Sequence, residues 1–182
     1  METDTQGSPP ERRHFLKELA AICIGAIVTL VPAAAGFLVV LDPLKKKKAA
    51  GDLVKVTNLA SLPNDGVPRK FPVLSNREDA WNRFPSSPIG AVYLRRTGEK
   101  DIRALNVICP HAGCFVDYRS DLTGYFCPCH NSTFSIDGDI NDPKSPSPRG
   151  LDELTVEIRN ENEVWVKFQN YRTGKKEMEP LA

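Results

Sequence analysis

The sequence predicts an all-β domain preceded by one transmembrane helix, and three observations support this prediction. Residues 19–41 form an uncharged run of 23 residues. From Leu53 onward, short β-branched and aromatic stretches alternate with turn residues. The chain contains 15 prolines and 12 glycines, a composition that disfavours helices in the second part. Its 182 residues fit one modest domain and an appendage, and a net charge of +1 gives no reason to expect nucleic-acid binding.

Residues 1–18 are expected to be a cytoplasmic N-terminus that carries an export signal. Arg12 and Arg13 begin the stretch Arg-Arg-His-Phe-Leu-Lys, which is similar to a twin-arginine signal, with Glu11 where Ser or Thr is usual. The alternative is an ordinary basic flank of a membrane helix. The twin-arginine route carries folded proteins, and it would deliver the following domain to the outer, periplasmic side of a bacterial cytoplasmic membrane.

Residues 19–41 are expected to be a transmembrane anchor. As a helix the run would be about 35 Å long, enough to cross a hydrocarbon core of about 30 Å with some tilt. Pro32 and Gly36 are candidate positions for a kink. The small residues 33–35 offer an alternative, a signal-peptide cleavage site. Because residues 37–41 continue the apolar run, we favour an uncleaved anchor.

Residues 42–52 are expected to be a linker, since they are charged and lack apolar periodicity. Four of them, residues 45–48, are lysines. A positive-inside count would place these lysines in the cytoplasm, although the count is nearly balanced between the two flanks of the helix. The export signal therefore decides for a single-pass protein with its domain outside.

Residues 53–182 are expected to form the β domain, with two cysteine-containing motifs on its loops. The residues 78–81 could form one helical turn. The predicted strands are residues 53–56, 71–74, 89–95, 102–107, 124–126, 154–159 and 164–168. The predicted breaks between them are residues 63–66, Pro85 with Pro88, residues 97–98 and residues 160–162.

The two motifs, residues 109–114 and 127–130, each supply one cysteine and one histidine as candidate metal ligands. The candidates are Cys109, His111, Cys127 and His130, with fifteen residues between the two motifs' ligands. The sequence of a structural zinc site usually has two cysteines close together and then two histidines close together, as C-x2–4-C followed by H-x3–5-H. Here the two ligand types are interleaved, which lets each loop give a sulfur to one iron and a nitrogen to the other. The spacing therefore favours a [2Fe–2S] cluster with mixed ligands over zinc.

The motifs read C-x-H-x-G-C and C-x-C-H-x-S, and they resemble those of the Rieske iron–sulfur subunit of cytochrome bc-type complexes. Gly113 and Ser132 fall in register as well. The resemblance implies a Rieske-type antiparallel β-sandwich head with a cluster-binding loop subdomain. It implies one [2Fe–2S] cluster with Cys109 and Cys127 on one iron and His111 and His130 on the other. It also implies a disulfide between Cys114 and Cys129, which Rieske domains of ring-hydroxylating oxygenases lack.

Other segments match the same family less closely. Residues 145–150 resemble its proline loop, in which Pro146 and Pro148 would cover the cluster, although Ser145 stands where the family usually has Gly. Residues 42–52 correspond to a hinge. Ser132 matches a serine that donates a hydrogen bond to a cluster sulfur, so we expect it to contact the cofactor.

Three departures from the family pattern affect the expected redox potential and the local shape. Phe134 replaces a tyrosine that donates a hydrogen bond to a ligand sulfur in high-potential members. The absence of this hydrogen-bond donor predicts a lower redox potential of the cluster, suited to a low-potential quinol such as menaquinol. Asn131 replaces the usual Gly, and Ala112 replaces a larger apolar residue. At these two positions the resemblance therefore does not define the shape of the loops.

The resemblance implies electron transfer from a membrane quinol to a c-type cytochrome, with a cytochrome b-type subunit as partner in a respiratory complex. A histidine ring nitrogen would accept a quinol proton, which makes His130 and His111 the candidate catalytic residues, His130 first. The chain alone would not be a complete enzyme. Two alternatives remain: the small Rieske subunit of an arsenite oxidase-like molybdoenzyme, and a structural zinc module.

Overall fold

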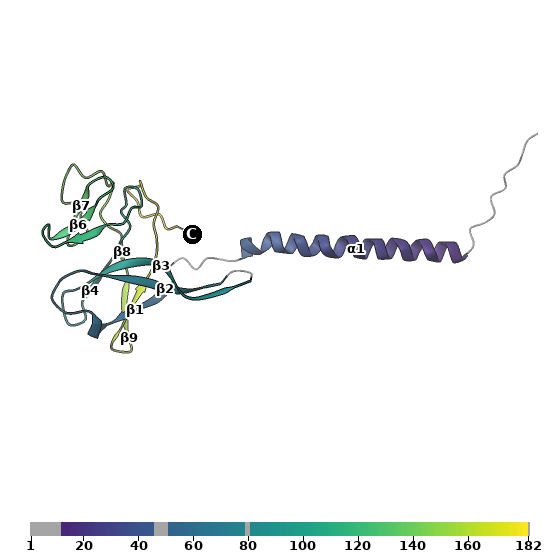
Figure 1. The fold of residues 1–182 in the computed structure, drawn as a ribbon, viewed down its shortest axis with the longest axis horizontal. Helices are drawn as coiled ribbons and strands as arrows, with labels where there is room; N and C mark the ends of the chain where they lie inside the picture. Colours follow the sequence, from purple (N-terminus) through teal and green to yellow (C-terminus); the bar gives the residue numbers. More distant parts are fainter. Residues whose placement is uncertain (1–11, 46–50, 79–80, 182) are drawn as a thin grey trace, which may run out of the picture. The chain divides into compact units, whose positions relative to one another are not determined.

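The computed structural model describes residues 12–78 and 81–181 apart from residues 46–50 (Figure 1). It divides into two units, Met1–Lys48 and Ala49–Ala182, which we describe separately. The described part of the first unit is one α-helix and the second unit is built mainly from strands, so the predicted fold class is confirmed.

The helix, α1, spans Arg12–Lys45 and is longer than the predicted anchor. Its stretch His14–Leu41 is long and apolar enough to cross a membrane. The helix includes both Pro32 and Gly36, and Figure 1 draws it as one unbroken coil. Its large apolar side chains between Phe15 and Val40 are exposed, so they need an apolar environment such as a bilayer.

The ends of α1 bear on two predictions. Arg12 and Arg13 of the predicted export signal are its first two residues, while residues 1–11 lie outside the described part. The apolar stretch ends at Leu41, where the predicted anchor ends, but the helix itself continues to Lys45, so the first four residues of the predicted linker are helical. The remainder of that linker falls on residues 46–50, also outside the described part, and on Gly51 and Asp52.

The second unit consists of three antiparallel sheets and a short 3-10 helix, η1, at Leu59–Ser61. The sheets have the strand orders β1-β10-β9, β2-β3-β4-β8 and β5-β6-β7. The strands are β1 (Leu53–Asn58), β2 (Arg69–Glu78), β3 (Arg83–Arg96), β4 (Ile102–Asn106), β5 (Asp117–Arg119), β6 (Gly124–Cys127), β7 (Ser132–Ser135), β8 (Glu153–Leu154), β9 (Val156–Arg159) and β10 (Glu163–Lys167).

Two hydrophobic cores lie on opposite faces of the β2-β3-β4-β8 sheet. Val92, Leu94 and Ala104 belong to the first core, which they share with Val164 and Val166 of the β1-β10-β9 sheet. The intervening residues of β3 and β4, Tyr93 and Leu105, belong to the second core. Successive side chains of a strand point to opposite faces, so this sheet is covered on both sides.

The second core joins this sheet to the β5-β6-β7 sheet, which forms a separate subdomain (Figure 1). Its members are Tyr93, Leu105, Val107, Cys109, Val116, Tyr125, Cys127, Phe134 and Leu151. Two of the predicted metal ligands are therefore core residues of the subdomain. The predicted sandwich with a loop subdomain is confirmed, and the subdomain has a sheet of its own.

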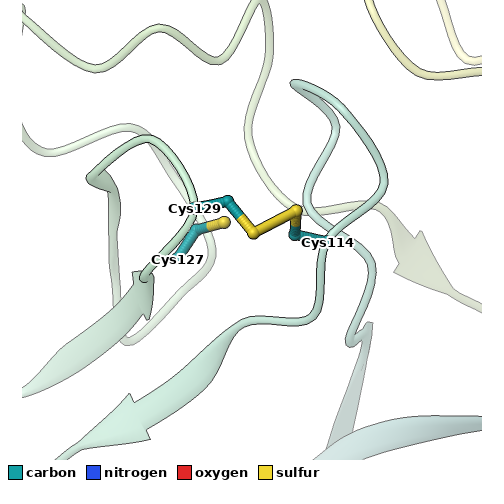
Figure 2. A group of neighbouring side chains, drawn as sticks. All are labelled: Cys114, Cys127 and Cys129. Carbon is teal, nitrogen blue, oxygen red and sulfur yellow. A yellow bond between two sulfur atoms is a disulfide. The ribbon is translucent and has the colours of Figure 1, made fainter.

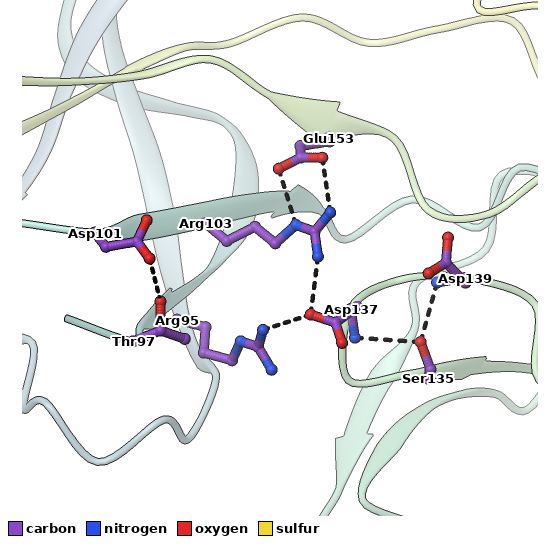
Figure 3. A network of polar contacts seen from close by, with 8 residues as sticks. All are labelled: Arg95, Thr97, Asp101, Arg103, Ser135, Asp137, Asp139 and Glu153. Carbon is purple, nitrogen blue, oxygen red and sulfur yellow. Dashed lines mark hydrogen bonds and ion pairs between the residues drawn. The ribbon is translucent and has the colours of Figure 1, made fainter.

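A polar network also joins the two parts (Figure 3). Asp137, in the turn after β7, accepts hydrogen bonds through one carboxylate oxygen from Arg95 on β3 and from Arg103 on β4, the latter at 2.8 Å. Arg103 also donates two hydrogen bonds to the Glu153 carboxylate, at 2.9 and 3.1 Å. The β2-β3-β4-β8 sheet and the turn after β7 are thus held together by ion pairs as well as by packing.

The β2–β3 hairpin differs from the prediction. Pro85 and Pro88 were expected to interrupt the strands, but both lie within β3. The reason is that β3 pairs with β4 only over Val92–Arg96, so its first part is bonded on one side and can lack an N–H donor on the other. The helical turn predicted at residues 78–81 is also wrong at Glu78, which belongs to β2; residues 79–80 lie outside the described part.

Candidate metal centre

The first ligand loop connects β4 to β5 and is closed by its own backbone. The Cys109 N–H donates to the Cys114 carbonyl at 2.7 Å, and the Gly113 N–H donates to the Cys109 carbonyl at 2.9 Å. Gly113 has φ of +84°, a conformation that favours glycine. The tight turn leaves His111 half-buried and Ala112 exposed, while Cys109 remains in the core with 1% of its surface accessible.

The second ligand loop is the turn of the β6–β7 hairpin. Cys127, the last residue of β6, pairs in register with Ser132, the first residue of β7. Asn131 has φ of +57°, in the left-handed region. Asparagine is the residue that adopts this conformation most readily after glycine, which explains how it can stand where the family usually has glycine.

The two loops are joined by a disulfide between Cys114 and Cys129, as predicted, with a Cα–Cα distance of 6.6 Å (Figure 2). The sulfur of Cys127 lies within 4.8 Å of both disulfide sulfurs. These three sulfurs form the one cluster of metal-ligand type found among the described residues. It is not a metal site, because two of its sulfurs are already bonded to each other.

The four predicted ligands are brought to the two facing loops and divide by burial. Cys109 and Cys127 each have 1% of their surface accessible, whereas His111 is half-buried and His130 is exposed. The two imidazole rings lie 4.7 Å apart between centroids, at an interplanar angle of 87°. Burial raises the pKa of the Cys109 thiol, and the neighbouring Cys127 sulfur acts in the same direction, while the Ser132 hydroxyl and the His111 backbone oppose them.

The donor set fits a [2Fe–2S] cluster better than a single ion. A tetrahedral zinc site would bring all its donor atoms close together, but no three of the four predicted ligands form such a group within the described residues. Ser132 supports the same conclusion, because its side chain is fully buried and its Oγ has no hydrogen-bond partner of regular geometry. A sulfur of the cluster would give this orphaned hydroxyl its acceptor.

The predicted proline loop lies between the turn after β7 and β8. Pro146 is exposed and Pro148 is half-buried. Ser147, which is 6% accessible, donates through its Oγ to the Arg149 carbonyl at 2.7 Å. A Cβ on Gly150 would lie 2.6 Å from the Gly138 carbonyl oxygen, so this position requires glycine and the loop packs closely on the turn after β7.

Phe134 is completely buried within the second core, where it shares the interior with Cys109 and Cys127. In the hairpin it pairs in register with Tyr125 of β6. Burial raises the pKa of Tyr125 far above its usual range, so this neighbour stays neutral. The position of Phe134 is therefore a tightly enclosed one beside the ligand loops.

Three polar residues near the site were missed by sequence reasoning. Arg149 and Asp152 form an ion pair at 2.7 Å with side chains only 10% and 3% accessible. Asn106, 1% accessible, accepts a hydrogen bond from the Ile108 N–H at the start of the first ligand loop. The signal that could have found Asn106 is a polar residue at the end of an apolar strand.

The comparisons with known proteins agree with this geometry. The model of the Rieske [2Fe-2S] domain matches residues 53–158, and the chain belongs to this family. Its cofactor is accordingly a [2Fe–2S] cluster, and the zinc alternative is excluded.

Among the curated relatives are iron–sulfur subunits of bc-type complexes. The menaquinol:cytochrome c reductase iron-sulfur subunit of Bacillus subtilis (strain 168) is 32% identical over 123 residues, which cover 66% of this chain and 70% of the relative. The subunit of the same name from Geobacillus thermodenitrificans is 30% identical over 122 residues, covering 65% and 69%.

A cytochrome b6-f complex iron-sulfur subunit from Gloeobacter violaceus is 27% identical over 164 residues, covering 85% of this chain and 83% of the relative. A solved structure, the plasma membrane Rieske protein of Synechocystis PCC 6803, is 25% identical with a TM-score of 0.43, covering 63% of this chain and 99% of that one. The curated relatives favour a bc-type Rieske subunit over the arsenite oxidase-like alternative.

Proposed function

We propose that this chain is the iron–sulfur subunit of a quinol:cytochrome c reductase and passes one electron at a time from menaquinol to a c-type cytochrome. Two relatives, each matched over more than two thirds of its length, are named menaquinol:cytochrome c reductase iron-sulfur subunit. The oxidoreductase activity belongs to the complex, in which a cytochrome b-type subunit would be the partner that holds the quinol.

The observation that carries the proposal is the division of the ligands by burial. We assign Cys109 and Cys127 to the inner iron, since both thiols are in the core. We assign His111 and His130 to the outer iron, since the imidazoles are the ligands that reach the surface. This arrangement supports a cofactor whose titratable ligands face a substrate while its sulfur ligands remain away from water.

The bound cluster supplies a one-electron acceptor, and the protein's residues handle the proton. A quinol that gives up an electron must also lose a proton, so a base must lie within hydrogen-bond reach of its hydroxyl. The exposed imidazole of His130 meets this requirement best, and His111 is less accessible. With the cluster bound, the buried and unpartnered Ser132 hydroxyl would donate to a cluster sulfur, and the buried Phe134 ring would help to keep water from the sulfur ligands.

Three further observations support the proposed orientation. The helix stretch His14–Leu41 is long and apolar enough to cross a membrane, and we propose that it anchors the chain in the bacterial cytoplasmic membrane. The Cys114–Cys129 disulfide is of a kind that persists in an oxidising compartment, which supports a periplasmic position for the β domain. Arg12 and Arg13 fit a twin-arginine signal that would bring the loaded domain there.

Purification of the full chain from its native membranes tests the proposal. We expect the reduced protein to show a Rieske-type EPR spectrum, to co-purify with b-type haem, and to be reduced by a menaquinol analogue. Replacement of His130 by Ala would serve as the control that abolishes this reduction. Co-purification with a molybdopterin subunit and without b-type haem would refute the proposal in favour of the arsenite oxidase-like alternative.

A further inference from the structure

After β10 the chain forms a folded C-terminal segment, residues 169–181. The segment closes on itself: the Arg172 N–H donates to the Glu179 carbonyl, and the Leu181 N–H donates to the Asn170 carbonyl, both at 2.8 Å. It lies beyond residues 53–158, the part matched by the family domain. Membership of the family therefore does not explain what this segment does.

The C-terminal segment contacts the first ligand loop through its backbone. The Gly174 N–H donates to the Pro110 carbonyl at 2.8 Å, and Pro110 is a fully buried residue next to His111. Gly174 has φ of +72°, and a Cβ there would lie 3.8 Å from the His111 carbonyl oxygen. The Thr173 methyl group is 3.7 Å from the Cβ position of Gly113. The segment thus lies directly against the loop that carries His111.

The same segment is bonded to the proline loop through one side chain, Arg149. Its Nη1 donates to the carbonyls of Arg172, at 3.1 Å, and Lys175, at 2.6 Å. Its Nε and Nη2 donate to the two carboxylate oxygens of Asp152 at 2.7 and 2.8 Å. Four hydrogen bonds from one buried guanidinium use the planar fork that lysine lacks.

The start of the segment is bonded to a second buried residue, Asn106. The Asn106 Nδ2 donates to the Gln169 carbonyl and to Asn170 Oδ1, both at 3.0 Å, while its Oδ1 accepts from the Ile108 N–H at 3.0 Å. The Asn106 backbone N–H donates to the Asp152 carbonyl at 2.8 Å. One buried residue therefore connects the first ligand loop, the C-terminal segment and the partner of Arg149.

We propose that Arg149 is a positioning residue, which uses the C-terminal segment to hold the His111 loop and the proline loop in fixed relative position. This inference rests on the proposed function, in which His111 is a cluster ligand and the proline loop covers the cluster. The relative position of the two loops matters for that reason. Without the Arg149 guanidinium, the two loops lose their common support and water reaches the cluster more freely, which changes its potential.

The test compares Arg149→Gln with Arg172→Gln in the full chain. Both changes remove one positive charge, but the Arg172 side chain is exposed and its carbonyl remains available as an acceptor. In Arg149→Gln we expect amide hydrogen exchange to become about tenfold to hundredfold faster at residues 111–113 and at positions 147 and 149 together, as for loss of hydrogen bonds to a charged group. We also expect a larger change in cluster potential than Arg172→Gln causes.

Equal exchange rates and equal potentials in the two variants would overturn the proposal. If Arg149→Gln does not fold, the wild-type chain still decides it: the Gly174 amide must be protected and must open together with the amides of residues 111–113. Unprotected exchange at Gly174 would overturn the proposal. These exchange measurements do not need the cluster, so a missing Rieske EPR spectrum would refute the proposed function without deciding the role of Arg149.

Discussion

Replacement of Phe134 by Tyr is expected to raise the potential of the cluster by tens of millivolts. Phe134 has no accessible surface and shares the second core with Cys109 and Cys127. A tyrosine there adds one hydroxyl beside the ligand sulfurs and keeps the ring that fills the core. A hydroxyl that donates to a ligand sulfur stabilises the extra negative charge of the reduced state, which raises the potential.

The magnitude follows from the strength of such a bond. A hydrogen bond to a charged acceptor is worth about 1.5–3 kcal/mol. If about half of this differs between the oxidised and reduced states, the shift is about 30–60 mV, since about 59 mV corresponds to a tenfold change for one electron. Conversely, the wild-type potential should lie below that of members with both the serine and the tyrosine.

Protein-film voltammetry on wild-type and variant protein measures this shift. Phe126→Tyr is the matched control, because Phe126 lies in the adjacent strand β6 but is only half-buried and is outside the second core. Ser132→Ala should lower the potential instead. The reasoning fails if Phe134→Tyr changes the potential no more than Phe126→Tyr, or if the wild-type value lies near the top of the Rieske range of about −150 to +300 mV.

Three further predictions concern the ligands, the disulfide and the polar network. Cys109→Ser or His130→Ala should abolish the Rieske EPR spectrum, and a normal spectrum in either variant would contradict the ligand assignment. Replacement of Cys114 and Cys129 by Ala should retain the spectrum but lower the stability by about 3 kcal/mol, because the disulfide closes a loop of 15 residues; denaturant unfolding measures this loss. Asp137→Ala should lower the free energy of unfolding by about 1–2 kcal/mol in the same assay, since the mostly buried Arg95 loses the carboxylate that it pairs with. An unchanged denaturation midpoint would show that this ion pair contributes nothing to stability.

The sequence predicted the local features of this fold better than those that depend on distant contacts. The apolar run of α1 and the alternating strands β1 and β4 have periodicities that can be read directly. The first part of β3, which contains Pro85, was missed, because whether a proline is tolerated there depends on which side of β3 has a neighbour. Strands β5 and β7 were missed because they are short and polar, and they are formed by pairing with β6.

In the candidate site, too, some residues could be predicted from the sequence and others depend on distant contacts. Cysteine and histidine spacing is set by the chemistry of the metal, so Cys109, His111, Cys127 and His130 could be proposed as ligands from the sequence alone. The role of Arg149 could not, because its partners at Arg172 and Lys175 are backbone carbonyls more than twenty residues away. Every residue has a backbone carbonyl, so the residue type does not show which carbonyl accepts a hydrogen bond.

The closeness of Cys127 to the disulfide has a consequence for biogenesis. Three sulfurs within 4.8 Å of one another are within reach of thiol–disulfide exchange, so in a protein without iron the Cys127 thiolate could attack either disulfide sulfur. Attack on either sulfur would form a disulfide to Cys127 and release the other cysteine as a thiolate, which would use up the proposed ligand and leave a wrong pairing. Iron bound to Cys127 would withhold its thiolate from exchange, so insertion of the metal before oxidation would enforce the Cys114–Cys129 pairing. Export of an already loaded and folded domain would impose that order of events.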